Sequence, residues 1–373
     1  GRVMTARRRH RRHGEQEGCC ACLWANRNYS AVRQCQRWCM ISFEWCMLGL
    51  GPILIVTVMV IVGCETYWTV RYILPSFAAA YGLRWGAHAA WIAWLATNGL
   101  FNYFSCVLTD PGSHASEVYR ALVFEACENG EVSALEMAEY CDANGFDLPS
   151  LEDGRRSSQR QPSSSWLDRG PFEWGYCKHS QAPKAPRAHF DHVTKKLVLN
   201  MDHYCPWMFN VVGYANYRYF VLFLFWVVVA CLYGVLITAT PFLALAAPSH
   251  ARRPYRPKTR HARSAVMFTF VLALSVGIAV FILFAWHLFL VFTAQTTIEF
   301  YGNTTLRHRA RSRGLKFTNP YDRGFKRNWQ HVFGHRHPLL AILPSSRPPP
   351  AKPWPPPENP AAATPLARAT RIV

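Results

Sequence analysis

The sequence predicts an all-α polytopic membrane protein, with four transmembrane helices and a cytosolic, mostly irregular loop domain between helices 2 and 3. Long apolar stretches are the first observation behind this class, because a helix needs about 20 mainly apolar residues to cross a bilayer. The second is an aromatic content of 14%, with 14 Trp, which suits membrane–water interfaces. The third is a net charge of +19 over 373 residues, clustered beside the apolar stretches. A basic excess favours nucleic acid or anionic lipid. Because the basic residues here lie beside apolar stretches, we expect the membrane bilayer to be the partner and expect no nucleic acid.

The apolar stretches place two helices within residues 46–108 and two within residues 219–293. In order, they run over residues 46–66, 86–108, 219–247 and 265–292. The second is the weakest, because it is rich in Ala and Trp. Buried core helices of a soluble protein are the alternative, but charge-free stretches of this length are rare in soluble cores. A channel or transporter is disfavoured, because no stretch carries a row of charged residues.

An even number of spans places both termini on the same side of the membrane. The Arg-rich residues 7–13 and the basic residues 307–316 favour the cytosol as that side, because cytoplasmic segments carry an excess of Lys and Arg. The loop between the last two spans, residues 249–263, is also basic and disagrees with this rule. We keep the even count, since it brings both basic termini and the long polar loop to the cytosolic face.

The polar segments form five regions. We expect a basic cytosolic N-terminus over 1–45, an acidic insert with a flexible linker over 109–170, the loop domain over 171–218, a cytosolic C-terminal region over 294–345 and a Pro-rich tail over 346–373. The acidic part of the insert, residues 113–153, is compatible with one or two short helices; we expect it to be solvated, with substrate binding as the alternative. We expect the tail to be extended and solvated, with docking into an aromatic groove as the alternative.

The stretch MDHYCPW, residues 201–207, holds three reactive residue types within four positions: Asp202, His203 and Cys205. A free thiol has a pKa of about 8.5, so little of it is thiolate at neutral pH. A nearby imidazole can take the thiol proton, and a carboxylate can orient that imidazole. The spacing alone therefore fits a reactive cysteine at a membrane surface, and it equally fits a structural cysteine near an unrelated histidine.

A longer stretch, MDHYCPWMFNVVGYANYRYF, resembles the signature of the DHHC protein S-acyltransferases, with Tyr204 where the second His usually stands. DPG at 110–112, TTIE at 296–299 and NPYDRGFKRNWQHVFG at 319–334 resemble three further motifs of that family, in the family's order. The chain is identified by these motifs as a member, a DHYC variant, over residues 46–345. Its ending, LPSSRPPP followed by PWPPP, also resembles the Abl-philin branch.

The resemblance assigns roles to the reactive residues. Cys205 resembles the nucleophile that is acylated by palmitoyl-CoA, His203 its general base and Asp202 the residue that orients the base. The acyl group then passes to cysteine thiols of substrate proteins at the cytosolic face. The acyl chain of the family lies in a cavity between the four helices. An endoplasmic reticulum or Golgi membrane is the family's usual address.

The resemblance also assigns three supporting residues: Thr297, Glu299 and Asn319. It implies that Thr297 supports the active-site loop through Asp202, and that Asn319 caps backbone groups near the third span. His287, within the fourth span, reads as a polar residue that faces the helix bundle rather than as a ligand.

The zinc ligands of the family are depleted in this chain. Its eight ligand positions hold Cys177, Ser180, Phe190, Asp191, Thr194, Leu197, Tyr204 and Val211. Structural zinc needs four ligands, usually Cys and His. We expect a loop held by apolar packing, with zinc absent or bound at most at one non-standard site made by Cys177 with His179, His189, Asp191 or His192.

Tyr204 replaces a zinc ligand and not the base, so the Asp-His-Cys arrangement survives. We therefore expect an active protein S-palmitoyltransferase. The alternative is a catalytically impaired DHHC-like membrane scaffold. Cysteines just before the first span can be S-acylated themselves, or can remain unmodified; they are Cys19, Cys20, Cys22, Cys35, Cys39 and Cys46.

Overall fold

The structure is a computed structural model that describes residues 20–82, 84–147, 170–246, 257, 259–349 and 352–355. The Arg-rich start, the linker over 155–165, most of the basic loop over 249–263 and the tail beyond residue 355 lie outside the described residues. The side chains of Cys20, Cys22, Cys35 and Cys39 are outside them too. The chain divides into two compact units, Gly1–Met47 and Leu48–Val373. The first contains the N-terminal part of α1 (Cys20–Trp68), and the second contains the rest of α1 and all other elements.

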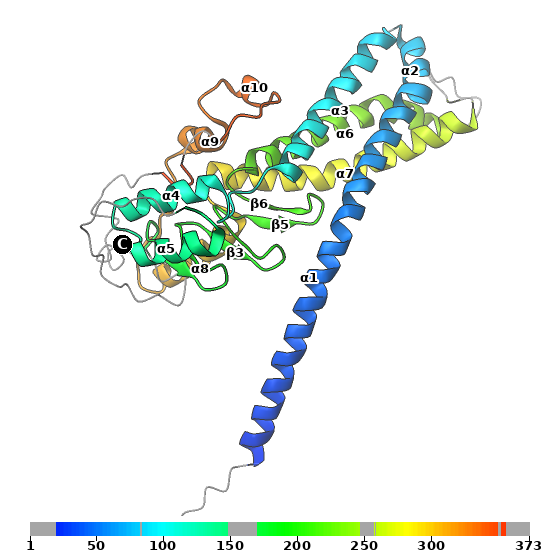
Figure 1. The fold of residues 1–373 in the computed structure, drawn as a ribbon. Helices are drawn as coiled ribbons and strands as arrows, with labels where there is room; N and C mark the ends of the chain where they lie inside the picture. Colours follow the sequence, from blue (N-terminus) through cyan, green and yellow to red (C-terminus); the bar gives the residue numbers. More distant parts are fainter. Residues whose placement is uncertain are drawn as a thin grey trace, which may run out of the picture. The chain divides into compact units, whose positions relative to one another are not determined.

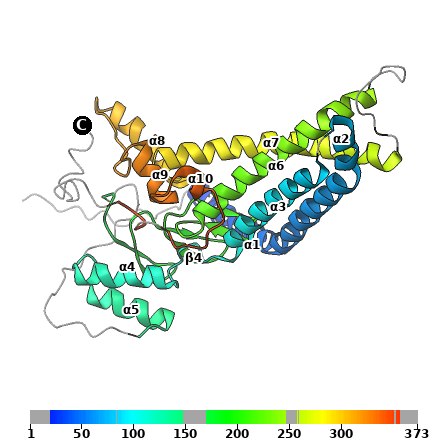
Figure 2. The same ribbon diagram turned by 90° about the horizontal axis from the view of Figure 1, so that it is seen from above.

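Long helices form the apolar part of the second unit. The end of α1 continues through a π-helical turn, Thr69–Ile73, into α2 (Leu74–Tyr81), and α3 (Trp85–Leu108) follows. Later in the chain come α6 (Tyr217–Ala246) and α7 (Arg260–Phe292), which lie side by side (Figures 1 and 2). Glycines permit their close approach: a Cβ at Gly277 would lie 3.0 Å from Cys231 Cβ, and one at Gly234 would lie 3.3 Å from Ala273 Cβ.

Three of these segments are long and apolar enough to cross a membrane among the residues described. They are Glu44–Ala80, Tyr217–Leu245 and Arg260–Phe292. The predicted second span corresponds to α3, which begins and ends within one residue of the predicted stretch 86–108 but is not in this set. His88, Asn98 and Asn102 lie within α3 and lower its mean hydropathy. The fold is thus mostly helical, as predicted.

The loop domain contains three small antiparallel β-hairpins, which the prediction of a mostly irregular domain did not include. The hairpins pair β1 (Gly175–Cys177) with β2 (Ala182–Lys184), β3 (His189–Asp191) with β4 (Lys196–Val198), and β5 (His203–Cys205) with β6 (Asn210–Val212). Each strand has only three residues, which is too short for the alternation of apolar and polar residues that marks a strand in a sequence.

The acidic insert folds as a pair of helices, α4 (Glu117–Glu128) and α5 (Ala134–Asn144), which lie beside each other (Figure 2). Ser133 and Glu136 form a capping box at the start of α5. The two helices share a buried core with the loop domain, in which Tyr119, Met137 and Tyr140 are fully buried. The prediction of a solvated insert was therefore wrong, because one face of each helix is apolar and covers β1 and β2.

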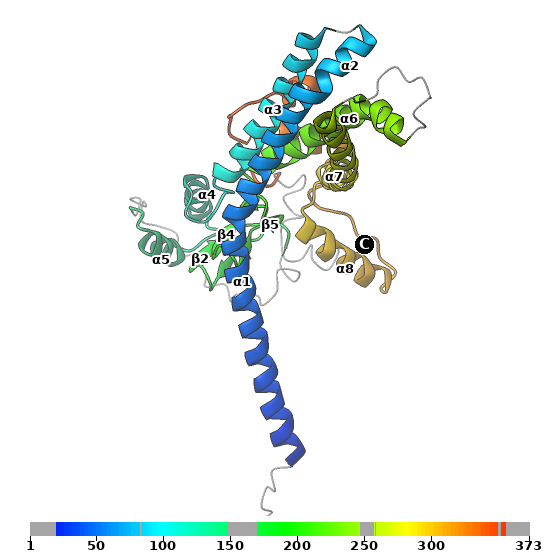
Figure 3. The ribbon, with the colours of Figure 1, turned by 90° about the vertical axis from the view of Figure 1, so that its right-hand side faces the viewer.

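The C-terminal region begins with α8 (Thr297–Arg311), which follows the end of α7 (Figure 3), and continues through α9 (Phe325–Phe333) and α10 (Pro338–Ala341). Part of the Pro-rich tail is docked rather than solvated. Trp354 packs edge-to-face on Trp174, with ring centroids 6.0 Å apart, and Lys352 pairs with Glu125 of the insert.

Candidate active site

The β5–β6 hairpin is fixed to the end of α3 by amide side chains. Asn210 Nδ2 donates to the carbonyl oxygens of Cys106 at 3.0 Å and Thr109 at 2.9 Å. Asn216 Nδ2 donates to Val211 O at 2.8 Å, and its Oδ1 accepts from Gly213 N at 2.9 Å. The last carbonyls of a helix have no partner within the helix. These contacts therefore satisfy the end of α3 and set the position of the hairpin.

The DPG stretch holds the same junction from the other side. Asp110 Oδ1 accepts from Gly112 N at 2.9 Å and Ser113 N at 2.6 Å, so its side chain closes a tight turn. The backbone then approaches the loop domain closely: a Cβ at Gly213 would lie 2.9 Å from Pro111 O. Any larger residue at position 213 would push the hairpin away from α3.

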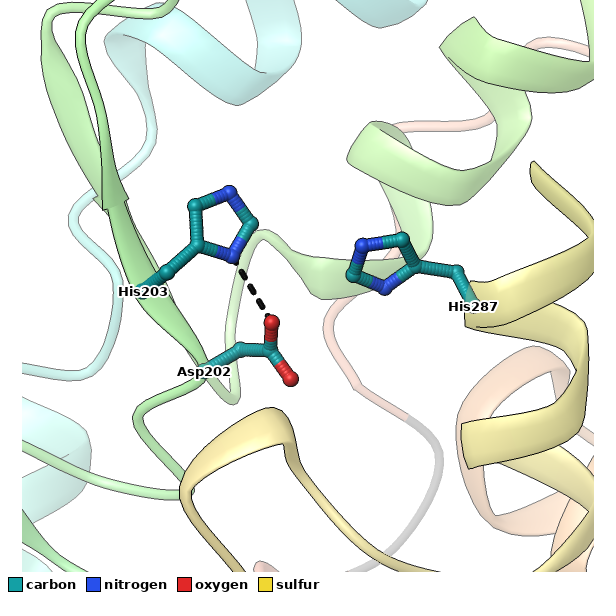
Figure 4. Close-up of side chains that lie close together, drawn as sticks. All are labelled: Asp202, His203 and His287. Carbon is teal, nitrogen blue, oxygen red and sulfur yellow. Dashed lines mark hydrogen bonds and ion pairs between the residues drawn. The ribbon is translucent and has the colours of Figure 1, made fainter. Parts of the chain in front are cut away.

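Asp202, His203 and Cys205 come together on this hairpin. His203 Nδ1 lies 2.7 Å from Asp202 Oδ2, and Cys205, two residues further along β5, lies close enough to raise the pKa of His203. Asp202 is 1% exposed and Cys205 is 7% exposed. Figure 4 shows the Asp202–His203 contact, with the imidazole held between the strand and the helices. The geometry is that of a thiol, an imidazole and a carboxylate in series.

The start of α8 holds Asp202 in place. Thr297 N donates to Asp202 Oδ1 at 2.7 Å, and Thr297 Oγ1 donates to Asp202 Oδ2 at 2.9 Å. A carboxylate at a helix N-terminus also gains from the helix dipole. Every hydrogen bond that Asp202 receives favours its ionised form.

These contacts set the protonation states of the pair. Burial disfavours ionised Asp202, yet hydrogen bonding to His203, the positive charge of His203 and the Thr297 amide together lower the Asp202 pKa. Burial also opposes the charged form of His203, but the hydrogen bonds and charges of Asp202 and Cys205 outweigh it and raise the pKa of His203 to about 9. Since Asp202 is ionised, His203 Nδ1 carries the proton that it donates, and the raised pKa lets the imidazole hold a second proton accepted from the thiol.

Glu299 is joined to the loop domain by a buried arginine that sequence reasoning missed. Arg187 Nε and Nη2 each donate to the Glu299 carboxylate at 2.6 Å, and both side chains are buried. Glu299 also accepts from Thr296 N at 2.9 Å, which completes a capping box for α8. A bidentate pair of this kind fixes α8 against the loop domain. The sequence offered no means to find this partner, because Arg187 and Glu299 are 112 residues apart.

Asn319 caps the end of α7, the predicted fourth span, and not the third span as expected. Its Nδ2 donates to Thr293 O at 2.7 Å, and its Oδ1 accepts from Tyr321 N at 3.2 Å. Asn328, which the sequence analysis did not single out, donates to Phe292 O at 2.7 Å. Both amides satisfy carbonyls at a helix C-terminus. The C-terminal motif therefore holds the end of the helix that leads into Thr297.

His287 is a second residue that the sequence analysis undervalued. Ligating atoms of Asp202, His203 and His287 all lie within 4.8 Å of one another, and Figure 4 shows His287 reaching toward the pair from α7. Its Nδ1 lies 3.1 Å from the hydroxyl of Tyr217, and its ring packs edge-to-face on Phe220. Only the packing of α7 against the hairpin, which the sequence does not show, brings it there.

The former zinc-ligand positions are occupied by packing and by local hydrogen bonds. Leu197 and Val211 are fully buried, and Tyr204 packs beside Val211. Asp191 Oδ2 accepts from both Thr194 N and Thr194 Oγ1 at 2.7 Å, so two ligand positions now bond to each other.

The non-standard zinc site has no matching cluster in the described part of the chain. Phe190 stacks on His179 and meets His192 edge-on. Among the described residues, the one group of three side chains that could bind a single ion is Asp202, His203 and His287. Cys177 is not a member of that group. The side chains present do not fit the two zinc sites of the family.

An apolar cavity of about 210 Å³ lies among the long helices of the second unit. Residues from α1, α3, α6 and α7 line it, including Leu95, Phe223, Trp226, Cys231 and Leu272. Its lining is predominantly apolar, although Glu65 and Thr269 also contribute.

Comparison with known proteins places these features in one family. The sequence model of the DHHC palmitoyltransferase family matches residues 171–304. Probable protein S-acyltransferase 14 of Arabidopsis thaliana is 30% identical over 80% of this chain and 85% of its own length. Palmitoyltransferase PFA3 of Yarrowia lipolytica is 28% identical over 84% of this chain and 77% of its own length. Palmitoyltransferase ZDHHC2 of Mus musculus is 32% identical, but over 43% of this chain and 40% of its own length.

The chain belongs to the DHHC palmitoyltransferase family. It is an integral membrane protein and an enzyme, a protein S-palmitoyltransferase. The family takes palmitoyl-CoA as acyl donor, acts on protein substrates and generally binds zinc.

Proposed function

We propose that Cys205 is the nucleophile of this palmitoyltransferase, that His203 is its acid and base, and that Asp202 orients His203. The observation that carries this proposal is the buried Asp202 carboxylate, which accepts from Thr297 and from His203, with Cys205 two residues further along the same strand. The carboxylate keeps the proton of the imidazole on Nδ1, so that Nε2 takes the thiol proton.

In the first step the Cys205 thiol gives its proton to His203 Nε2, and the thiolate attacks the carbonyl carbon of palmitoyl-CoA. A new carbon–sulfur bond forms, the bond to the sulfur of CoA breaks, and the imidazolium protonates the departing CoA thiolate. In the second step a cysteine thiol of a substrate protein loses its proton to His203 and attacks the acyl-enzyme. Cys205 leaves as a thiolate and recovers a proton from His203.

The apolar cavity is the place for the acyl chain. Helices α1, α3, α6 and α7 all line this cavity. The proposal therefore counts α3 as the fourth span, although α3 is less apolar than the other three. Burial of the chain there would leave the thioester at the membrane surface beside Cys205. We place the loop domain and both termini in the cytosol, in an endoplasmic reticulum or Golgi membrane, on the charge distribution and the family's usual address.

The loop domain works without zinc in this proposal. Leu197, Val211 and the Asp191–Thr194 contact take the place of metal–ligand bonds, and the two amide side chains Asn210 and Asn216 hold the active hairpin on α3. The rigidity that catalysis needs then comes from packing and hydrogen bonds.

The test uses purified full-length protein, an alkyne-tagged palmitoyl-CoA and detection of hydroxylamine-sensitive label. We expect label on the wild type and on Cys177→Ser, which removes the other buried cysteine of the loop domain. Label should be lost in Cys205→Ser and should fall steeply in His203→Ala. Equal labelling of wild type and Cys205→Ser, in folded protein, would place the acylated thiol elsewhere.

A further inference from the structure

A second cavity, of about 330 Å³, lies among the loop domain, the adjoining ends of α6 and α7, and α9. Tyr217 and Arg218 contribute from the start of α6, Leu290 and Val291 from the end of α7, and His331 from α9. This basic cavity shares no lining residue with the apolar cavity assigned to the acyl chain, and none of Asp202, His203 and Cys205 lines it. It is therefore a separate site.

The lining of the basic cavity is strongly cationic. Four arginines line it, Arg187, Arg218, Arg323 and Arg327, and no Asp or Glu is present among the described lining residues. Glu299, which is not a lining residue, forms an ion pair with Arg187. A concave surface lined by one sign of charge concentrates ions of the other sign.

Arg218 gives the strongest indication of a missing partner. The residue is 6% exposed, and its Nη2 donates to the Tyr219 hydroxyl at 2.7 Å, to Ser345 O at 3.0 Å and to the carbonyl oxygen of Arg347. Its Nη1 is buried with no hydrogen-bond partner. A buried guanidinium that meets neutral acceptors alone is costly, because a buried charge normally pairs with an opposite charge.

We propose that the basic cavity binds a phosphate-bearing anion, a phosphate monoester, through Arg218 with Arg323 and Arg327. Guanidinium groups match phosphate oxygens with paired hydrogen bonds, and several around one cavity suit a doubly charged group. The cavity lies at the helix ends that the proposed orientation turns to the cytosol, where lipid head groups and soluble phosphate esters are both within reach. The site is then one at which an anion stabilises the contact between the loop domain and the C-terminal motif.

The experiment uses the full-length protein in nanodiscs of neutral phospholipid. One arm adds inositol trisphosphate, and the other builds phosphatidylinositol bisphosphate into the nanodisc; binding is read by native mass spectrometry and by the unfolding midpoint. We expect a bound phosphate ester and a raised midpoint, because a ligand that binds the folded state alone stabilises it. Binding in both arms identifies the phosphate group as the feature that is recognised. If phosphatidylinositol bisphosphate stays bound at a lower concentration than inositol trisphosphate needs, the membrane is the source of the ligand.

Three variants decide whether the cavity is the site. Arg218→Gln and Arg327→Gln should each weaken binding by roughly tenfold or more, the effect of losing one charge-assisted contact. Arg309→Gln removes the same charge from the exposed face of α8, outside the basic cavity, and should leave binding unchanged. Arg327 is exposed, so its variant decides the question if Arg218→Gln fails to fold.

Three results would overturn the proposal. The first is the absence of binding in both arms. The second is an equal loss of binding in all three variants, which would reduce the effect to diffuse charge. The third is an Arg327→Gln variant that binds both probes normally but shows a raised KM for palmitoyl-CoA, which would make the cavity part of the donor site. Labelling of Cys205 by tagged palmitoyl-CoA, without inositol trisphosphate and without phosphatidylinositol bisphosphate, keeps this test independent of the proposed catalytic roles.

Discussion

Asp202 sets the charge state of the catalytic imidazole, and this makes a prediction about pH. The ionised carboxylate and the thiol raise the pKa of His203 from 6.5 to about 9, so the imidazolium form persists at neutral pH. The stability that this form contributes is complete below the ordinary pKa of 6.5 and is lost as the pH rises through about 9.

For Asp202→Asn we expect slower acylation of Cys205. We also expect the fall of the acylation rate at high pH to begin at a lower pH than in the wild type. The reason is that the neutral amide no longer stabilises the imidazolium, so the His203 pKa falls back toward its ordinary range. The measurement is the rate of a single round of hydroxylamine-sensitive labelling across pH, with wild type as reference. An unchanged alkaline limb would mean that Asp202 does not act on His203.

At the scale of elements, the insert and the tail are joined through a contact between Trp354 and Trp174. Trp354 of the tail meets Trp174 at the edge of the core built by α4, α5 and the first hairpin. Pro353 O accepts from Arg187 Nη1 at 3.4 Å, so the tail also reaches the arginine that holds Glu299. The docked tail thus connects the insert to the base of α8.

A double-mutant cycle with Trp174→Ala and Trp354→Ala tests this contact. We expect each single change to lower the free energy of unfolding, and the two to couple by about 1 kcal/mol, the typical value of an edge-to-face aromatic pair beyond its buried area. Denaturant unfolding in detergent gives the four values. Strict additivity would show that the tail does not dock on Trp174.

At the scale of the whole molecule, the proposal that packing takes over the role of zinc makes a prediction about metal removal. Treatment of the folded enzyme with a strong chelator, followed by removal of the chelator–metal complex, should leave both the labelling rate and the unfolding midpoint unchanged. Structural zinc contributes directly to folding free energy, so a zinc-dependent loop would unfold under this treatment. A large fall in the midpoint, restored by added zinc, would contradict the account.

The long helices were predictable because apolar length is written in the sequence, and α7 ends at the expected residue, Phe292. The cluster of Asp202, His203 and Cys205 was predictable because its members are neighbours in the chain. Arg187 and His287 were not predictable, because they reach the site through contacts between distant segments of the chain. His287 is more than 80 residues from His203, and Arg187 is 112 residues from Glu299. The hairpins escaped prediction because three-residue strands have no readable period.

The most direct test of the central claim is a chase of the acyl-enzyme. Wild-type enzyme is labelled once with tagged palmitoyl-CoA, freed of donor and mixed with a cysteine-bearing substrate peptide, and the label on Cys205 and on the peptide is followed by mass spectrometry. The account predicts that label leaves Cys205 at the same rate as it appears on the peptide, in a thioester that hydroxylamine cleaves. Label that stays on Cys205 while the peptide remains unmodified, or peptide acylated equally by Cys205→Ser, would contradict the two-step transfer.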